Sequence, residues 1–170
     1  MERIEKTIEV NVPVRTAYDQ WTQFEEFPTF MEGVTEVQQV DDKTLRWVAE
    51  VAGTRKEWTA EILQQEPDQV VSWRSTSGAL NSGSVSFQPN GVDRTKVTLV
   101  MTYDPKGAKE TIGDALGVLS ARIEGDLRRF KEFIESRKVP TGAWRGEVRE
   151  GQVRKGQGAK AEDVGAVSEA

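Results

Sequence analysis

A long amphipathic segment near the C-terminus most constrains the fold of this chain. Between Lys106 and Lys138, apolar residues recur at steps of three and four, which places them on one face of an α-helix. These residues are Ile112, Leu116, Leu119, Ile123, Leu127, Phe130 and Ile134. At about 1.5 Å of rise per residue, a helix over residues 110–135 is roughly 40 Å long. Because packing supplies most of the stability of such a helix, it needs a broad apolar partner elsewhere in the chain.

The only large partner upstream is a series of predicted β-strands. Apolar and polar residues alternate in about seven segments, the pattern of strands with one buried face. These segments are 4–12, 34–40, 45–51, 58–62, 71–74, 85–87 and 97–103. Two short helices are predicted after the first strand, at 14–24 and 27–31, and the apolar spacing of three within 34–40 indicates a bulge. Short connections favour antiparallel neighbours. The sequence therefore predicts an α+β fold in which a curved antiparallel sheet packs around one long C-terminal helix.

The composition excludes several kinds of chemistry. The 170 residues include no cysteine and no histidine, which rules out thiolate zinc sites, cysteine nucleophiles and Ser-His triads. The net charge is −5 and no basic stripe is present, so nucleic acid is not an expected partner. No signal segment and no run of about 18 apolar residues occurs. We predict a cytoplasmic protein without a membrane span, a metal or a cofactor; the oligomeric state is left open.

The chain changes character after Lys138. Residues 139–170 hold six glycines, five basic and five acidic residues, and one aromatic residue, Trp144. Such a segment buries too little apolar surface to order itself. We therefore divide the chain into a folded domain at 1–138 and a disordered low-complexity tail at 139–170, although Trp144 can pack back on the domain. The near-repeat of residues 148–152 at 153–157 is attributed to low complexity.

Several short segments carry a resemblance to a known superfamily. They are Ile8–Pro13, Ala17–Trp21, Phe24–Met31, Trp58–Ile62, Val71–Arg74 and Gly83–Phe87. Together with the order of the elements, they resemble the START-related lipid-transfer superfamily (SRPBCC) over roughly residues 2–138. The most similar groups are the bacterial polyketide cyclase/dehydrase-like proteins and the coenzyme Q-binding START-like proteins. The resemblance implies a helix-grip fold with an apolar pocket between the sheet and the long helix, and it does not determine the activity.

The expected pocket lining follows from the inward face of the strands and helices. The predicted ligand-binding residues are Phe27, Phe30, Met31, Trp47, Ala49, Trp58, Ala60, Ile62, Trp73, Phe87, Leu99, Met101, Tyr103, Ile112, Leu116 and Leu119. Further inward positions are Leu45, Val71, Val85, Val97 and Ile123. This lining carries no charge and suits a hydrophobic small molecule in a pocket of about 300–1,000 Å³. The alternative is that the aromatic side chains fill the space completely. The interpretation requires Trp47, Trp58 and Trp73 to face inward.

Three functions remain open at this point. The first is the binding of a hydrophobic molecule such as a lipid, a quinone or a polycyclic aromatic compound, with movement of residues 27–31 and of the N-terminal half of the long helix to admit it. The second is a polyketide cyclase/aromatase-type enzyme that uses Tyr103 and Arg74, although alternation places Arg74 on the outer face. The third is an interaction module that uses the tail from Val139.

Overall fold

A computed structural model describes residues 2–51, 53–103 and 115–154 of the chain. Within these ranges it contains two α-helices, one 3₁₀-helix and nine strands. In chain order they are β1 (Glu2–Val10), α1 (Val14–Trp21), η1 (Phe24–Thr29), β2 (Val34–Asp41), β3 (Thr44–Val51), β4 (Thr54–Glu66), β5 (Val70–Gly78), β6 (Asn81–Pro89), β7 (Thr95–Tyr103), α2 (Ala115–Arg137), β8 (Glu147–Arg149) and β9 (Gln152–Arg154). The described part of α2 thus begins at Ala115, and the predicted start of the helix near residue 110 lies outside the described residues.

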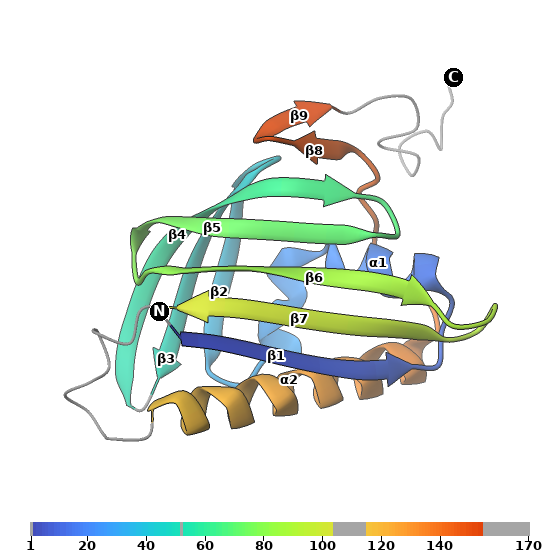
Figure 1. Cartoon of the computed structure of the whole chain (residues 1–170), viewed down its shortest axis with the longest axis horizontal. Coiled ribbons are helices and arrows are strands. Elements are labelled where there is room, and N and C mark those ends of the chain that lie inside the picture. Colours follow the sequence, from blue (N-terminus) through green and yellow to red (C-terminus); the bar gives the residue numbers. More distant parts are fainter. Residues whose placement is uncertain (1, 52, 104–114, 155–170) are drawn as a thin grey trace.

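The main sheet is antiparallel throughout, with the strand order β1-β7-β6-β5-β4-β3-β2. Because β1 pairs with β7 rather than with β2, the first and last long strands lie side by side (Figure 1). The two short helices between β1 and β2 lie inside the curl of the sheet. The predicted fold class, a curved antiparallel sheet around a long C-terminal helix, is confirmed.

Irregularities in β2 and β4 accompany the curvature. The register of β2 against β3 shifts between Val34 and Glu36, which confirms the bulge expected in this strand. The register of β4 against β5 shifts twice, between Thr59 and Ala60 and between Ile62 and Gln64. Bulges bend a strand and increase its twist. They bring the β2–β4 part of the sheet around toward α2 and so create the concave side on which the cavity lies.

The long helix packs its apolar face against β1 and the short helices. Phe130 and Ile134 are fully buried, and the Phe130 ring lies 5.1 Å from Trp21 and 5.3 Å from Phe30, centroid to centroid. Burying a large apolar side chain contributes about 1.5–3 kcal/mol, so this half of α2 anchors the helix. Lys6, a charged residue on the apolar side of β1, lies within 3.8 Å of Glu124 on α2, which accounts for its position.

The prediction of a disordered tail is wrong for residues 139–154, which we name the C-terminal strap. Pairing between β3 and β4 ends at Thr44 and Glu61, so β4 continues past its neighbour. The strap adds β8 along this exposed edge, where Val148 pairs with Gln65 and is fully buried. The near-repeat forms the hairpin itself, since Val148 pairs with Val153.

Polar contacts hold the rest of the C-terminal strap. The side chain of Gln20, fully buried on α1, accepts a hydrogen bond from the Thr141 backbone N–H at 2.8 Å and donates to the Thr141 hydroxyl at 3.1 Å. Trp144 packs against the core, as its aromatic character suggested. The composition of residues 139–154 does not predict that they are ordered. Their order comes from contacts between their few large side chains and residues of the folded domain. Residues 155–170 lie outside the described residues.

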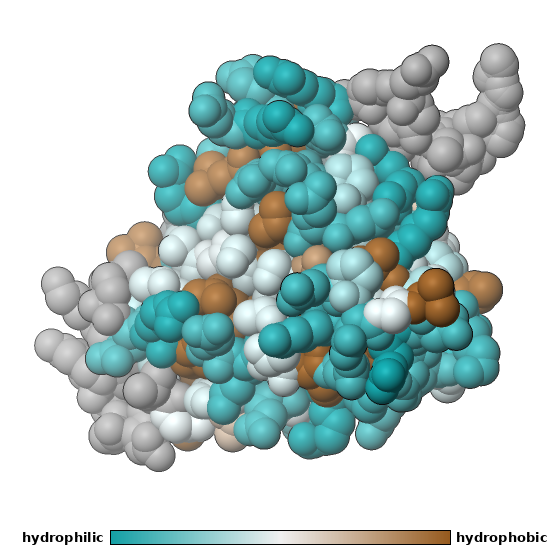
Figure 2. Space-filling view, turned by 45° about the vertical axis from the view of Figure 1, so that its right-hand side comes forward, coloured by the Kyte–Doolittle hydropathy of each residue, from teal (hydrophilic) through white to brown (hydrophobic). Residues whose placement is uncertain are grey.

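The face of the molecule shown in Figure 2 is mainly hydrophilic, with apolar residues in scattered patches. Most of the large apolar side chains instead form one buried cluster between the sheet, α1, η1 and α2. An apolar ligand is therefore expected to bind in the interior, between the sheet and the helices.

Candidate functional site

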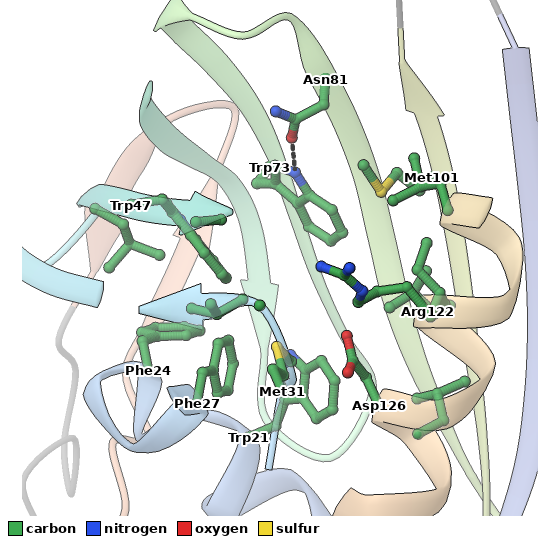
Figure 3. A pocket seen from close by; sticks show the side chains of 18 of the residues that line it. Trp21, Phe24, Phe27, Met31, Trp47, Trp73, Asn81, Met101, Arg122 and Asp126 are labelled. Atoms are coloured by element: carbon green, nitrogen blue, oxygen red, sulfur yellow. Dashed lines mark hydrogen bonds between the residues drawn. The ribbon is translucent and has the colours of Figure 1, made fainter. Parts of the chain in front are cut away.

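A cavity of about 160 Å³ lies between the inner face of the sheet and α2 (Figure 3). Its wall is formed by Trp21, Phe24, Phe27, Met31, Glu32, Gly33, Val34, Leu45, Trp47, Ala49, Trp58, Ile62, Val71, Trp73, Asn81, Leu99, Met101, Leu119, Arg122, Ile123, Asp126 and Leu127. The aromatic side chains therefore do not fill the space completely. The cavity is nevertheless smaller than the range expected from the sequence.

The sheet side of the cavity is an aromatic wall. Trp47 on β3 and Trp58 on β4 occupy directly paired positions, and their rings are parallel within 8° at a centroid distance of 5.6 Å. The Phe27 ring of η1 lies 5.6 Å from Trp47 and 5.2 Å from Trp21. Aromatic side chains packed edge and face in this way hold one another's orientation. The wall is thus a rigid apolar surface.

Trp73 extends this wall on β5. It pairs with Gly83 on β6, and a Cβ at Gly83 would overlap with the Trp73 ring, so the ring lies directly over the glycine backbone. The indole N–H of Trp73 donates a hydrogen bond of 2.9 Å to the Asn81 side-chain oxygen (Figure 3). The Asn81 amide nitrogen in turn donates to the Ala79 carbonyl. The polar atoms at this end of the cavity therefore serve to fix Trp73.

The helix side of the cavity carries charge, in contrast to the uncharged lining that the sequence suggested. Arg122 and Asp126 lie on successive turns of α2, and both face the cavity (Figure 3). Arg122 Nη1 donates to the Glu50 carbonyl at 2.9 Å. Asp126 Oδ1 accepts from the Glu32 backbone N–H at 3.0 Å and from Arg129 Nη2 at 2.6 Å.

These contacts also hold the turn between η1 and β2 against α2. Arg129 Nε donates to the Phe30 carbonyl at 2.9 Å, adjoining the bond from Glu32 to Asp126. Gly33 completes the turn with a φ of +91°, and a Cβ there would overlap with Arg122 Nη1. Since Met31, Glu32 and Gly33 all line the cavity, the polar side chains of α2 position one rim of it.

Asp126 has a perturbed protonation equilibrium. Burial raises the pKa of its carboxyl group to about 6, against the opposing effects of Arg129, the Glu32 backbone N–H and Arg122. The group is therefore ionised at neutral pH, but it is considerably more basic than an exposed aspartate.

A second charged cluster lies outside the cavity lining, under the C-terminal strap. Arg145 forms ion pairs with Asp19 on α1 and, at 2.9 Å, with Asp68 in the β4–β5 turn. Its guanidinium lies 5.6 Å from the centre of the fully buried Tyr18 ring. Burial raises the pKa of both Asp19 and Tyr18, although Arg145 opposes the shift in each case. This cluster joins the strap to the domain.

The structure brings most of the predicted ligand-binding residues together. Those on the cavity wall are Phe27, Met31, Trp47, Ala49, Trp58, Ile62, Trp73, Leu99, Met101 and Leu119. The condition that Trp47, Trp58 and Trp73 face inward is met. Phe30, Ala60, Phe87 and Tyr103 are buried but do not line the cavity. Ile112 lies outside the described residues, as does the side chain of Leu116.

The two residues proposed for catalysis are not part of the wall. Arg74 is exposed, with its side chain at 60% of full accessibility, and lies 3.6 Å from Glu61 on the outer face of the sheet, as strand alternation requires. Tyr103 is buried in the core beside the cavity. The idea that Arg74 acts on a bound ligand is therefore wrong.

Sequence reasoning missed the charged side of the cavity. Arg122, Asp126 and Asn81 are not among the ligand-binding residues predicted from the sequence, yet all three line the cavity. The available signal was the position of Arg122 and Asp126 four residues apart, each next to an apolar residue of the stripe, Ile123 and Leu127. A residue at the border of the apolar stripe of a helix faces a cavity rather than water where the opposing sheet leaves space.

The described residues show neither a membrane-spanning helix nor a cluster of metal ligands. No helix within 2–51, 53–103 and 115–154 is long and apolar enough to cross a membrane. Within the same ranges, no three acidic side chains are grouped so that they could hold a metal ion.

Comparison with known proteins places this geometry in context. Residues 10–132 match the family model described as polyketide cyclase / dehydrase and lipid transport. An uncharacterized 17.2 kDa protein of Streptomyces lincolnensis is 48% identical over 149 residues, which is 87% of this chain and 99% of the relative.

Two solved structures share the fold. The Zhui aromatase/cyclase of Streptomyces sp. R1128 aligns with a TM-score of 0.67 and 18% identity, over 80% of this chain and 94% of that one. A START superfamily protein of Mycobacterium smegmatis aligns with a TM-score of 0.58 and 17% identity, over 75% and 97% of the two chains. At these identities the likeness concerns the fold alone.

Proposed function

We propose that this chain, which belongs to the polyketide cyclase/dehydrase and lipid transport family, binds a small, flat, apolar molecule in the cavity between its sheet and α2. The observation that carries the proposal is the wall of Trp47, Trp58 and Trp73, contributed by three neighbouring strands to one cavity. Aromatic side chains of this kind recognise flat rings by stacking and edge contacts. The START-related family resemblance noted in the sequence is confirmed by the family match.

The volume of the cavity limits the size of the ligand that it can hold. An engineered apolar cavity of about 150 Å³ binds benzene, and the cavity here is about 160 Å³. A molecule of one or two fused rings therefore matches the space better than a long-chain lipid or an isoprenoid quinone. Removal of its apolar surface from water supplies the driving force, at about 25 cal/mol per Å².

The other functions considered from the sequence receive less support. Neither residue suggested for a cyclase, Tyr103 or Arg74, lies on the cavity wall. Residues 139–154 of the tail are bound within the chain itself, which leaves fewer residues for an outside partner. Ligand binding is the function that accounts for the largest number of the residues lining the cavity.

Calorimetric titration of the full chain with naphthalene tests the proposal. We expect saturable binding with a change in tryptophan emission, because four tryptophans line the cavity. The variant Ala49→Leu fills part of the cavity and should weaken binding at least about tenfold, since overfilling a packed site is unfavourable. Ala121→Leu, on the exposed face of α2, is the matched control and should bind like wild type. Absence of both a binding heat and an emission change in the wild-type protein would overturn the proposal.

A further inference from the structure

One side of the cavity is chemically unlike the rest. Arg122 and Asp126 bring a cation and a carboxyl group to the wall that faces Trp73 and Trp21 across the cavity (Figure 3). A purely apolar ligand would cover the largely buried Asp126 carboxyl group and the half-buried Arg122 with hydrocarbon. Loss of contact with water without a new polar partner is unfavourable for charged groups. The pair therefore indicates that the ligand carries a polar group of its own.

The two side chains are fixed in place but retain hydrogen-bonding capacity. Arg122 donates to the Glu50 carbonyl through Nη1, and a guanidinium has five N–H donors in total. The bonds to Asp126 from Glu32 and Arg129 converge on Oδ1, and a carboxylate offers roughly four acceptor positions. One wall thus presents donors and acceptors four residues apart on the same helix.

The signs of these groups restrict what the polar group can be. A carboxylate on the ligand would be attracted by Arg122 but repelled by Asp126. An ammonium group on the ligand would be attracted by Asp126 but repelled by Arg122. A neutral hydroxyl satisfies both, because it donates one hydrogen bond and accepts others. Burial raises the pKa of Asp126, which makes its carboxylate a stronger acceptor for such a donor.

We infer that the cavity selects an aromatic alcohol of the phenol or naphthol class, with its ring against the tryptophan wall and its hydroxyl between Asp126 and Arg122. The hydroxyl donates to the Asp126 carboxylate, and its oxygen accepts from the Arg122 guanidinium. Asn81 does not compete for this role, since its side chain bonds to Trp73 and to the Ala79 carbonyl. The inference rests on the proposed function and specifies the ligand of the same cavity.

Four ligands of matched shape test the inference by calorimetry at pH 7, namely 2-naphthol, 2-methoxynaphthalene, naphthalene and 2-naphthoate. We expect 2-naphthol to bind at least about tenfold more tightly than naphthalene, because a hydrogen bond to a charged group is strong in a buried site. The methyl ether has lost the donor and should fall near naphthalene. Equal affinity for 2-naphthol and naphthalene, or tighter binding of 2-naphthoate, would overturn the inference.

Variants locate the preference on the wall. Arg122→Met and Asp126→Asn should each bring the affinity for 2-naphthol to within about threefold of the affinity for naphthalene, both measured in the same variant. Arg128→Met, which removes an exposed arginine from the same helix, should retain the full preference. A preference that survives both cavity variants would contradict the inference, and if either variant fails to fold, the wild-type series decides alone.

The outcomes separate this inference from the proposed function. If naphthalene binds but no hydroxyl preference appears, the inference fails and the proposed function stands. If naphthalene does not bind the wild-type protein, the proposed function fails, and the inference that rests on it fails as well.

Discussion

The protein contains two clusters in which an arginine lies near aspartates, one under the C-terminal strap and one on the cavity wall. Their comparison shows how similar residues serve different purposes. Arg145 meets two carboxylates at once, Asp19 and Asp68, and its side chain is only 13% exposed. Arg122 and Asp126 make their closest contacts with the backbone and with Arg129, and both face a cavity. The first cluster is closed on itself, whereas the second borders a space that a ligand can enter.

The comparison teaches that burial of a charged residue does not by itself indicate a functional site. The pKa of Asp19 and that of Asp126 are both raised by burial. What distinguishes Asp126 is the cavity beside it. The strap cluster should therefore affect stability alone, and the cavity cluster should affect both stability and ligand choice.

The largest effect is expected from breaking the strap cluster with Arg145→Met. Loss of the arginine leaves Asp19 and Asp68 without their common partner, and removal of one member of a buried ion pair costs about 3 kcal/mol or more. The free energy of unfolding from urea denaturation should fall by this amount. Arg149→Met, which removes an exposed arginine from β8 of the same strap, is the control and should change it by less than about 0.5 kcal/mol.

The relative affinities for naphthalene and 2-naphthol should be unchanged in folded Arg145→Met protein. An altered ligand preference in this variant would show that the two clusters are coupled, and the distinction drawn between them would not hold.

The next largest effect concerns the pH dependence of stability through Asp126. Its pKa is 3.8 as the reference value and about 6 in the folded protein. Between these values the folded state holds a proton that the unfolded chain has released, so the stability contributed by this group is complete below pH 4 and is lost as the pH rises through 6. At about 1.4 kcal/mol per pKa unit, the loss is about 2–3 kcal/mol.

Asp126→Asn should abolish this dependence. The difference in unfolding free energy between wild type and variant, measured from pH 4 to pH 7 in urea, should change by about 2–3 kcal/mol in favour of the variant. Asp93→Asn, in the exposed turn before β7, provides a matched loss of charge. Parallel curves for wild type and Asp126→Asn would refute the assignment.

The smallest effect on stability is expected from replacing Gly33. Comparison with a second glycine distinguishes the effect of its contact with Arg122 from the effect of its positive φ. Gly33 and Gly91 both have positive φ, +91° and +97°, but only at Gly33 would a Cβ meet other atoms, first of all Arg122 Nη1. Replacing either glycine with alanine should cost about 1 kcal/mol from backbone strain. We expect Gly33→Ala to lose a further ~1 kcal/mol and part of the 2-naphthol preference, which titration of both variants would measure. Identical behaviour of the two variants would mean that the position of Arg122 is not set by this turn.

Much of the fold followed from local patterns. The alternation around Trp47, Trp58 and Trp73 predicted their shared face correctly, because side chains of a strand alternate whatever the strand pairs with. The spacing of Ile123, Phe130 and Ile134 likewise predicted the buried face of α2. Trp21 and Phe24 were not predicted as cavity residues, since their contribution depends on where α1 and η1 come to lie.

The misjudged residues are those whose environment is made by distant segments. The strap was predicted to be disordered from its composition, yet Gln20 and Asp19 on α1 and the free edge of β4 supply its partners. Arg122 and Asp126 were not predicted on the cavity wall, because a helical pattern shows which residues border the apolar stripe but not whether the facing surface is packed or hollow.

The amino-acid sequence by itself determined the order of the elements, the inward face of each strand and the apolar stripe of α2, because these depend on periodicities within a few residues. Only the tertiary structure decided that a cavity of about 160 Å³ remains, that a charged pair faces it, and that residues 139–154 return to the edge of β4. Those features arise from how closely segments far apart in the chain approach one another, and bulges, register shifts and side-chain volumes jointly set that distance.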